Sequence, residues 1–549
     1  MKRREKILGA SLGSCVHVAG IQRFLRMCEE EGYQTAFLGP AIAPQELVRA
    51  IEEHQPTIVA VSYRLTPEAA ERLFQELKGL LAERGLLDLR FVFGGTPPVA
   101  EVAKRAGLFE RVFSGLEPIE EVWAFIKGAR AARKEEDLSQ DLVSRVSWSQ
   151  PYPLIRHHFG RPTLAETIEG AKRIAEARVL DVLSIGPDQN AQESFFRPEE
   201  MDPEQDGAGG VPLRRAEDLE AIYEASRCGN SPLVRCYSGT RDLLKWAEMS
   251  LRTIRNAWAA IPLCWYSVLD GRSDRGLVEA ITENQQVIRW YAEKGIPVEV
   301  NESHQWSLRD AHDSLAVAMA FLAAYNAKKL GVRHYVAQYM FNTPPGTSPA
   351  MDLAKMLAKI ELIEGLHDEG FTTFREVRAG LASMPSDFAL AKGHLAASTT
   401  ISLALQPHIL HVVGYSEGDH AITAEELIES CKIAHGAIRN ALLGLPDFSH
   451  DPAVQKRKAE LISEAKALLE ALRDLGKEES DDPWAEPEVL ATAIEKGLLD
   501  TPHFFAHRYA RGAVVTRIIN GACYAVDPQS GRILTEAERL GRGRARDNR

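Results

Sequence analysis

The sequence predicts an α/β protein in which a small, doubly wound parallel domain is followed by a (β/α)8 barrel. Short apolar runs alternate with amphipathic helical segments along most of the chain. Between residues 129 and 161 this alternation gives way to charged and proline-containing sequence. A length of 549 residues also exceeds what one hydrophobic core supports. We therefore expect a first domain at 1–128, a linker at 129–161, a barrel at 162–445, and a helical segment with a small C-terminal domain at 446–549.

The first domain contains five apolar runs that we interpret as strands. They lie at 6–11, 35–38, 58–62, 90–94 and 111–113. Helical segments separate them, and Pro44 and Pro67 each stand where a proline opens a helix. Right-handed helical crossovers between parallel strands give a sheet covered on both faces. The expected fold is flavodoxin-like (Rossmann-like), with a ligand site beyond the carboxyl ends of the first and third strands.

Composition and charge exclude several classes of function. Hydrophobic residues make up 45% of the chain and charged residues 26%, as in an ordinary soluble protein. A net charge of -12 argues against general nucleic-acid binding, and no apolar run is long enough to cross a membrane. The N-terminus does not read as a signal peptide, so we expect a cytoplasmic protein. The basic run at 542–549 is expected to be a disordered tail.

Small and polar residues gather after successive strands of the first domain. They are Ser14, Cys15, Val16, His17 and Gly20 after the first strand, Ser62 and Tyr63 at the end of the third, Gly94, Gly95 and Thr96 at the fourth, and Gly115 after the fifth. Residues without bulky side chains let a flat group approach the backbone closely. These positions are therefore the predicted ligand site, with one histidine at the switch from strand to helix.

The segment Cys15-Val-His17-Val-Ala-Gly20 resembles the Asp-x-His-x-x-Gly pattern of base-off cobalamin proteins such as glutamate mutase, methylmalonyl-CoA mutase and methionine synthase. The resemblance implies that His17 ligates cobalt in place of the dimethylbenzimidazole base. The displaced nucleotide tail would then lie beside Ser62, Gly94, Gly95 and Gly115. His-x-x-Gly occurs four times in this chain, so its place after the first strand, rather than the motif alone, selects His17.

Cys15 departs from the family pattern, which has an aspartate that accepts a hydrogen bond from the metal-bound histidine. A neutral thiol is a poor acceptor, so the cobalt bond is expected to be weaker, unless another acceptor replaces the carboxylate or Cys15 ionises near the metal. A structural histidine in an ordinary flavodoxin-like domain remains an alternative. So does a zinc site made from Cys15, His17 and Cys28, although the spacing is atypical.

Seven further apolar runs predict the barrel. They lie at 178–185, 232–237, 261–268, 297–302, 333–339, 373–378 and 408–413, with one strand unassigned. In such barrels the reactive face lies at the strand ends. The candidate catalytic residues there are Glu302, His304, Tyr339 and Glu417. Glu302 could hold an amino group or relay protons, and His304 could act as a general acid.

The barrel resembles the large (epsilon) subunit of glutamate mutase in the segments at 324–339, 393–405 and 493–502. This resemblance implies an adenosylcobalamin-dependent radical mutase (an isomerase), with both subunits fused. The positions of the three substrate-gripping arginines of that family hold Asp188, Tyr237 and Asn301 instead, so the substrate is expected to be a small molecule other than glutamate. A non-catalytic cobalamin carrier or sensor and a corrinoid methyltransferase are the alternatives. A homodimer is expected.

Overall fold

The computed structural model describes residues 6–117, 119–128, 140–237 and 239–547. The chain forms two compact units, Met1–Asp137 and Leu138–Arg549. The central part of the predicted linker, 129–139, lies outside the described residues. No helix in the described ranges is both long enough and apolar enough to span a membrane.

The N-terminal unit is built on a five-stranded parallel sheet. Its strands are β1 (Lys6–Ser11), β2 (Gln34–Phe37), β3 (Ile58–Tyr63), β4 (Arg90–Gly95) and β5 (Arg111–Phe113), in the order β2-β1-β3-β4-β5. This order confirms the flavodoxin-like prediction, and each predicted strand is present to within a residue or two. The first and third strands are neighbours at the point where the order reverses, which is where ligands bind in such sheets.

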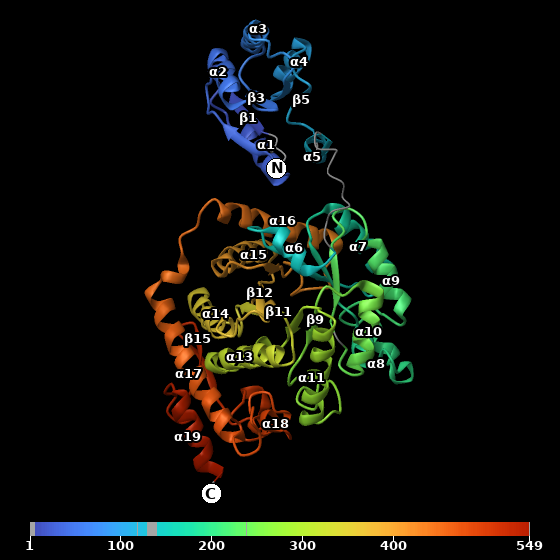
Figure 1. Cartoon of the computed structure of the whole chain (residues 1–549), viewed down its shortest axis with the longest axis vertical. Coiled ribbons are helices and arrows are strands. Elements are labelled where there is room, and N and C mark those ends of the chain that lie inside the picture. The colour runs from blue at the N-terminus through green and yellow to red at the C-terminus, as the bar shows by residue number, and fades with distance from the viewer. Residues whose placement is uncertain (1–5, 118, 129–139, 238, 548–549) are drawn as a thin grey trace. The chain divides into compact units, whose positions relative to one another are not determined.

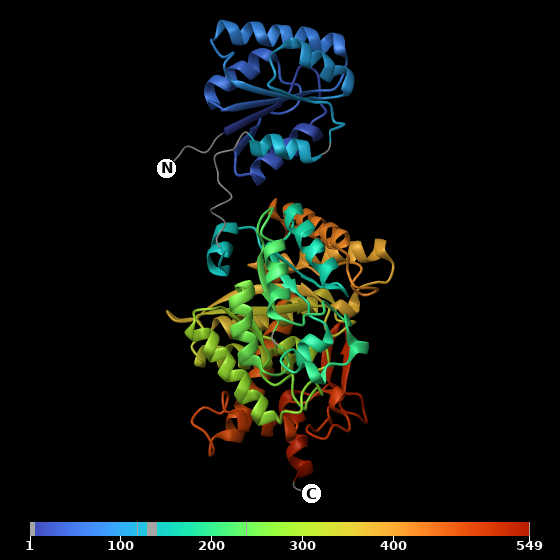
Figure 2. The same cartoon turned by 90° about the vertical axis from the view of Figure 1, so that its right-hand side faces the viewer.

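Helices cover both faces of this sheet, as Figure 2 shows. One face packs against α1 (Ala19–Glu30) and α5 (Ile119–Gly128), and the other against α2 (Pro44–His54), α3 (Pro67–Glu83) and α4 (Pro97–Ala106). Successive strand residues alternate between the two cores: Ile7 belongs to the α1 and α5 side, and Leu8 to the other. Apolar residues on both faces of each strand explain why these runs are continuous in the sequence.

The second unit contains an eight-stranded parallel barrel (Figure 1). Its strands are β6 (Leu154–Phe159), β7 (Val182–Ile185), β8 (Leu233–Cys236), β9 (Ala259–Ile261), β10 (Val298–Val300), β11 (His334–Phe341), β12 (Thr372–Ala379) and β13 (Ile409–His411). The ladder runs β8-β7-β6-β13-β12-β11-β10-β9, and among the described residues no ladder joins β8 to β9. At that seam the amide of Ala257 donates to the carbonyl of Val234 at 2.9 Å.

The strand that sequence reasoning left unassigned is β6, which lies inside the predicted linker together with α6 (Leu142–Ser149). The prediction of a linker is therefore wrong over these residues. The sequence of β6 is not a continuous apolar run, because the inward-facing Arg156 and His158 alternate with its outward-facing residues. The strand predicted at 261–268 is also displaced, since β9 ends at Ile261 and a buried loop follows.

Helices surround the barrel strands in Figure 1. They are α7 (Leu164–Ala177), α8 (Gln189–Ser194), α9 (Ala216–Ala225), α10 (Leu243–Ile254), α11 (Leu277–Glu293), α12 (Ser303–Ser307), α13 (Asp313–Lys329), α14 (Pro349–Glu364), α15 (Phe388–Ser402) and α16 (Ala424–Leu442).

The C-terminal segment consists of α17 (Pro452–Gly476), α18 (Pro487–Glu495), the hairpin β14 (Thr516–Ile519) and β15 (Ala522–Ala525), and α19 (Glu536–Asp547). It extends the core of the barrel unit, because α17 packs on α13 and α14 and Leu461 and Leu468 belong to the same apolar cluster as Leu315. The basic run predicted to be disordered instead lies in α19 as far as Asp547.

Candidate functional site

The loop after β1 fixes the position of His17. The hydroxyl of Ser11 donates to the carbonyl of Cys15 at 2.8 Å, and the amide of Ala41 donates to the same carbonyl at 3.0 Å. The chain then turns, and α1 begins at Ala19, two residues after His17. His17 is exposed, whereas Cys15 is fully buried. The histidine is therefore held by a short, tied loop and presents its ring to the surroundings.

The buried thiol of Cys15 lies against this ring. Its sulfur is 3.8 Å from Nδ1 of His17, the place where the cobalamin family has an aspartate. The Nδ1 atom faces protein, which leaves Nε2 as the nitrogen available to a ligand. The zinc alternative finds no support in this geometry, because Cys15 and Cys28 pack in apolar clusters on opposite faces of the sheet.

Beside His17 a cavity of about 480 Å³ lies between α1 and the carboxyl-terminal parts of β3, β4 and β5. Seven of the predicted cofactor-binding residues line it: His17, Gly20, Ser62, Gly94, Gly95, Thr96 and Gly115. Ser14, Cys15, Val16 and Tyr63 do not line it. Tyr63 is turned away because strand alternation places it in the apolar cluster on the opposite face of the sheet.

The cavity has the features needed for a flat heterocyclic group. Phe24, Phe113 and Val122 supply apolar walls that sequence reasoning did not single out. The hydroxyl of Ser62 is buried and has no hydrogen-bond partner among the described residues, so it is left to a ligand. A Cβ added at Gly94 would meet nothing within 4 Å. The displaced nucleotide base of cobalamin, which is aromatic and carries hydrogen-bonding atoms at its edge, fits these residues.

Gly95 and the loop after β5 close the cavity. A Cβ at Gly95 would lie 2.7 Å from the carbonyl oxygen of Tyr63, so only glycine fits there. The amides of Ser114 and Gly115 donate to the carboxylate of Glu117 at 2.9 to 3.0 Å. Burial opposes ionisation of Glu117, but these hydrogen bonds outweigh it and lower the pKa of its carboxyl group. The charged carboxylate therefore holds the loop in place.

The interior of the barrel contains a network of four buried charged residues, which we call the barrel ion network: Arg156, Arg235, Glu299 and Glu376. Arg156 on β6 pairs with Glu376 on β12, and Arg235 on β8 pairs with Glu299 on β10 at 3.1 Å. These strands are not neighbours in the sheet, so the side chains meet across the barrel interior. The indole of Trp258 also donates to Glu299 at 2.8 Å.

We call the carboxyl ends of the barrel strands the barrel mouth, and on β6 and β8 exposure increases towards it. On β6, Arg156 is buried and His158 is partly exposed; on β8, Arg235 is buried and Tyr237 is partly exposed. The hydroxyl of Tyr237 and Nδ1 of His158 are 2.9 Å apart. Solvent therefore reaches the interior from the barrel mouth, the face at which barrels of this type bind their ligands.

Glu302, a predicted catalytic residue, is fully engaged by protein donors. Its carboxylate accepts hydrogen bonds from the amides of Leu263 and Cys264 at 2.9 and 3.1 Å, and from the indole of Trp306 at 2.7 Å. Burial raises the pKa of this carboxyl group, and the three donors act in the opposite direction. Through these hydrogen bonds, Glu302 joins the loop after β9 to α12.

Tyr339 is not at the barrel mouth. It is fully buried in the apolar cluster formed with α13 and α14, whereas Val336, on the other face of β11, packs with residues of the barrel interior. The prediction of a substrate contact is wrong because the alternation of β11 turns this side chain outward. Burial raises the pKa of its phenol well above the ordinary value.

His304 and Glu417 lie near the barrel mouth, one at the start of α12 and the other in the loop after β13. Burial, with the nearby charge of Arg378, lowers the pKa of His304 to about 3, so the ring is neutral. Burial raises the pKa of Glu417 to about 7, although Arg378 opposes this shift. Nε2 of His157 lies 3.5 Å from the Glu417 carboxylate. Glu417 therefore has a carboxyl group able to exchange a proton near neutral pH.

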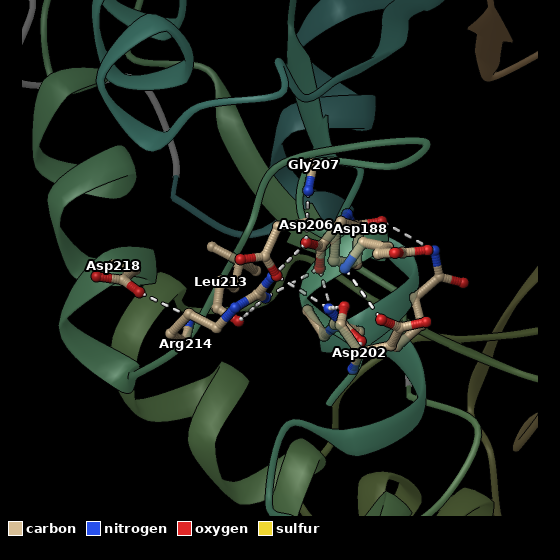
Figure 3. A network of polar contacts seen from close by, with 12 residues as sticks. Asp188, Asp202, Asp206, Gly207, Leu213, Arg214 and Asp218 are labelled. Atoms are coloured by element: carbon tan, nitrogen blue, oxygen red, sulfur yellow. Dashed lines mark hydrogen bonds and ion pairs between the residues drawn. The ribbon is translucent and has the colours of Figure 1, made fainter. Parts of the chain in front are cut away.

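Asp188 has a structural role, visible in Figure 3. It is fully buried, pairs with Arg214 at 2.6 and 3.0 Å, and accepts hydrogen bonds from the amides of Ala191 and Gly207. The loop after β7 is thereby fixed. Asp188 has no free oxygen to offer a substrate.

The interior charged residues that sequence reasoning missed are the arginines Arg156, Arg235 and Arg378. The signal was present as polar residues two apart within a strand or just past its end: Arg156 and His158, Arg235 and Tyr237, Glu299 and Asn301, Glu376 and Arg378. In a barrel strand such pairs point to the interior.

Comparisons with known proteins agree with the first unit's assignment. Residues 5–117 match the family model of the B12 binding domain. The N-terminal unit is thus a cobalamin-binding domain. No curated protein matches the sequence.

Several solved structures show partial similarity. A cobalamin-binding protein of Desulfitobacterium hafniense is 26% identical, covers 24% of this chain with 60% of its own, and has a TM-score of 0.21. A Rubisco-like protein of Rhodopseudomonas palustris is 9% identical and covers 60% of this chain with 81% of its own, with a TM-score of 0.31. The cobalamin-dependent S-adenosylmethionine radical enzyme OxsB is 11% identical and covers 91% of this chain with 72% of its own, with a TM-score of 0.18.

Proposed function

We propose that the protein is an adenosylcobalamin-dependent isomerase of the mutase type, in which Nε2 of His17 would ligate cobalt. The observation that carries the proposal is the cavity beside His17, in which the Ser62 hydroxyl has no partner among the described residues, within a unit that matches the B12 binding domain. A separate barrel with a polar, solvent-reached mouth on the same chain supports an enzyme rather than a simple carrier.

Bound adenosylcobalamin would supply a carbon radical able to take a hydrogen atom from a substrate. The protein's own residues would bind and shield. His17 would hold the cofactor through Nε2, with Cys15 orienting its ring through Nδ1. Ser62 and the glycines at 94, 95 and 115 would receive the nucleotide tail. In the barrel, Glu417 would hold or move a proton, because its pKa of about 7 lets both forms be populated.

The test of cobalt ligation uses the full-length protein loaded with cobalamin and reduced to Co(II). Electron paramagnetic resonance should show splitting from one axial nitrogen, and this splitting should change when the histidines are labelled with ¹⁵N. His17→Ala should lose it, while His450→Ala, which alters an exposed histidine, should keep it. Unchanged splitting in His17→Ala would exclude this ligand.

The test of the reaction class uses anaerobic protein with adenosylcobalamin and a panel of amino, hydroxy and acyl acids. A substrate-dependent Co(II)-radical signal, together with an isomeric product, supports the mutase. Methyl transfer from methylcobalamin would instead indicate a corrinoid methyltransferase. Cobalamin binding with neither reaction would indicate a carrier or sensor, and both of these results would overturn the isomerase proposal.

A further inference from the structure

Arg378 is a cation at the barrel mouth that no described acidic side chain neutralises by an ion pair. It lies two residues beyond Glu376 on β12, and its backbone is in register with Met340 and His411 on the adjacent strands. Within the described residues, its one side-chain hydrogen bond runs from Nε to the carbonyl of Ala379, at a long 3.4 Å. The other two interior arginines pair with Glu376 and Glu299. A partly buried guanidinium without an anion is poised to receive one.

Arg378 lies on the same face of β12 as Glu376, and the histidine rings near it carry no charge. Burial, with the charges of Arg156 and Arg378, lowers the pKa of His411 well below its usual value, and the same two charges act on His158. These rings are therefore neutral and do not compete for an anion. Glu417 attracts Arg378 electrostatically but makes no ion pair with it within the described structure, and burial favours its protonated form.

Polar atoms without partners lie in the same interior. Among the described residues, the side-chain oxygens of Asn301 and Gln338 are buried and accept no hydrogen bond, and Nε and Nη2 of Arg235 donate none. Asn301 is 7% exposed and lies two residues beyond Glu299 on β10. Gln338 is in register with Glu376, so it also faces the interior. Buried atoms of this kind are normally satisfied, and a ligand that carries N–H or O–H donors would satisfy these two oxygens.

We propose that the barrel mouth binds a small carboxylic acid whose carboxylate is held by Arg378 and whose hydroxyl or amino group donates to Asn301 or Gln338. The inference deepens the proposed function by naming the substrate class, and it rests on that function only in treating the ligand as a substrate. The guanidinium would come from β12, a position other than those of the three substrate-gripping arginines of glutamate mutase.

A singly charged carboxylate suits the mouth better than a phosphate. Among the described residues of the barrel interior, Arg378 is the one arginine without an ion pair, and the carboxyl group of Glu417 lies close enough to exert its charge on it. A dianion would need a second free cation and would be repelled by Glu417 when that group is ionised. One carboxylate matches one guanidinium in both charge and geometry.

The experiment measures binding of lactate, propionate and alanine to the full-length protein by calorimetry, with lactamide, propionamide and inorganic phosphate for comparison. The acids should bind, the amides should not, and lactate should bind more tightly than propionate because of its hydroxyl. Arg378→Gln should weaken lactate binding by roughly 10- to 100-fold, the value of a hydrogen bond to a charged group. Arg333→Gln, which removes an exposed arginine at the opposite end of β11, should leave it unchanged.

Two results would overturn the proposal: no acid of the panel binds, or Arg378→Gln binds lactate as well as the parent. Phosphate binding that is tighter than that of any acid and dependent on Arg378 would replace a carboxylate site by a phosphate site. The melting temperature of Arg378→Gln should not fall, since no ion pair is broken. The nitrogen splitting of the Co(II) form, recorded on the parent and on Arg378→Gln, separates the two proposals. If the parent shows no splitting, the proposed cobalamin function fails. Lactate binding still tests the barrel site in that case.

Discussion

The sulfur of Cys15 lies 3.8 Å from Nδ1 of His17. A carboxylate in this position would accept a hydrogen bond from the ring and increase its electron donation to a metal on Nε2. A neutral thiol does so weakly. A single substitution at Cys15 should therefore change the strength of the bond between His17 and cobalt.

Cys15→Asp should strengthen the bond between His17 and cobalt and tighten cobalamin binding by roughly 10- to 100-fold, the usual range for residues that support a metal ligand. The measurement is titration of the apoprotein with cobalamin followed by absorption, together with the nitrogen splitting of the Co(II) form. Cys15→Ser, which has a similar volume and no charge, is the matched control. Equal affinity in the aspartate and serine variants would show that this position does not act on the ligand.

Gly94→Leu should reduce cobalamin binding by at least tenfold while the domain still folds. A Cβ at Gly94 meets nothing within 4 Å, so the leucine side chain would extend into the cavity without a clash at its Cβ. Gly79→Leu on α3 is the control, because that glycine also has open space around it but does not line the cavity. Circular dichroism reports the fold and absorption titration reports binding. Tight binding by Gly94→Leu would place the nucleotide tail elsewhere.

Arg156→Met should destabilise the barrel by about 3 to 5 kcal/mol, because it leaves Glu376 as an uncompensated buried charge. Replacing both residues, as in Arg156→Met with Glu376→Gln, should recover part of this loss. Urea denaturation followed by tryptophan fluorescence measures the difference. A double variant no more stable than the single one would mean that hydrogen bonding of Arg156 to Ser184, rather than its charge, stabilises the interior.

Glu417→Gln should change the pH dependence of stability. The pKa of Glu417 is raised from 4.5 to about 7, so between these values the folded state keeps a proton that the unfolded state releases. Stability therefore falls as pH rises through this window, by about 3 kcal/mol in total, and the loss is complete above pH ~7. The glutamine variant lacks this loss: it should match the parent near pH ~4 and exceed it near pH ~8 in urea denaturation. Glu53→Gln, an exposed control, should show no such difference; a constant offset for Glu417→Gln would contradict the prediction.

The sequence predicted the N-terminal unit well because every strand there carries apolar residues on both faces and each turn carries glycine or proline. His17, Ser62 and Gly94 could be placed in one site because the carboxyl ends of parallel strands meet at one edge of the sheet. Tyr63 was misplaced, since the end of a strand does not reveal which face its last residue occupies.

The barrel was harder to predict because its interior is charged. Arg156 and His158 gave β6 the appearance of a linker, although Arg156 is neutralised by Glu376, which lies far away in the sequence. Glu302 looked catalytic because strand-end carboxylates often are, but its three hydrogen bonds come from a loop and a helix whose positions no local pattern reveals. Arg378 was overlooked for the opposite reason, since its lack of a partner is visible only in three dimensions.

The seam between β8 and β9 affects how the barrel deforms. Seven strand pairs are joined by ladders, whereas among the described residues no ladder joins β8 to β9. The bond from Ala257 to Val234 lies at this seam, and the ion pair between Arg235 on β8 and Glu299 on β10 spans it. The barrel is therefore a curled sheet whose two edge strands, β8 and β9, meet without a ladder. If the barrel mouth widens, β8 and β9 should separate while the ladders of β12 and β13 stay intact. Amide hydrogens of β8 and β9 should therefore exchange with solvent faster than those of β12 and β13.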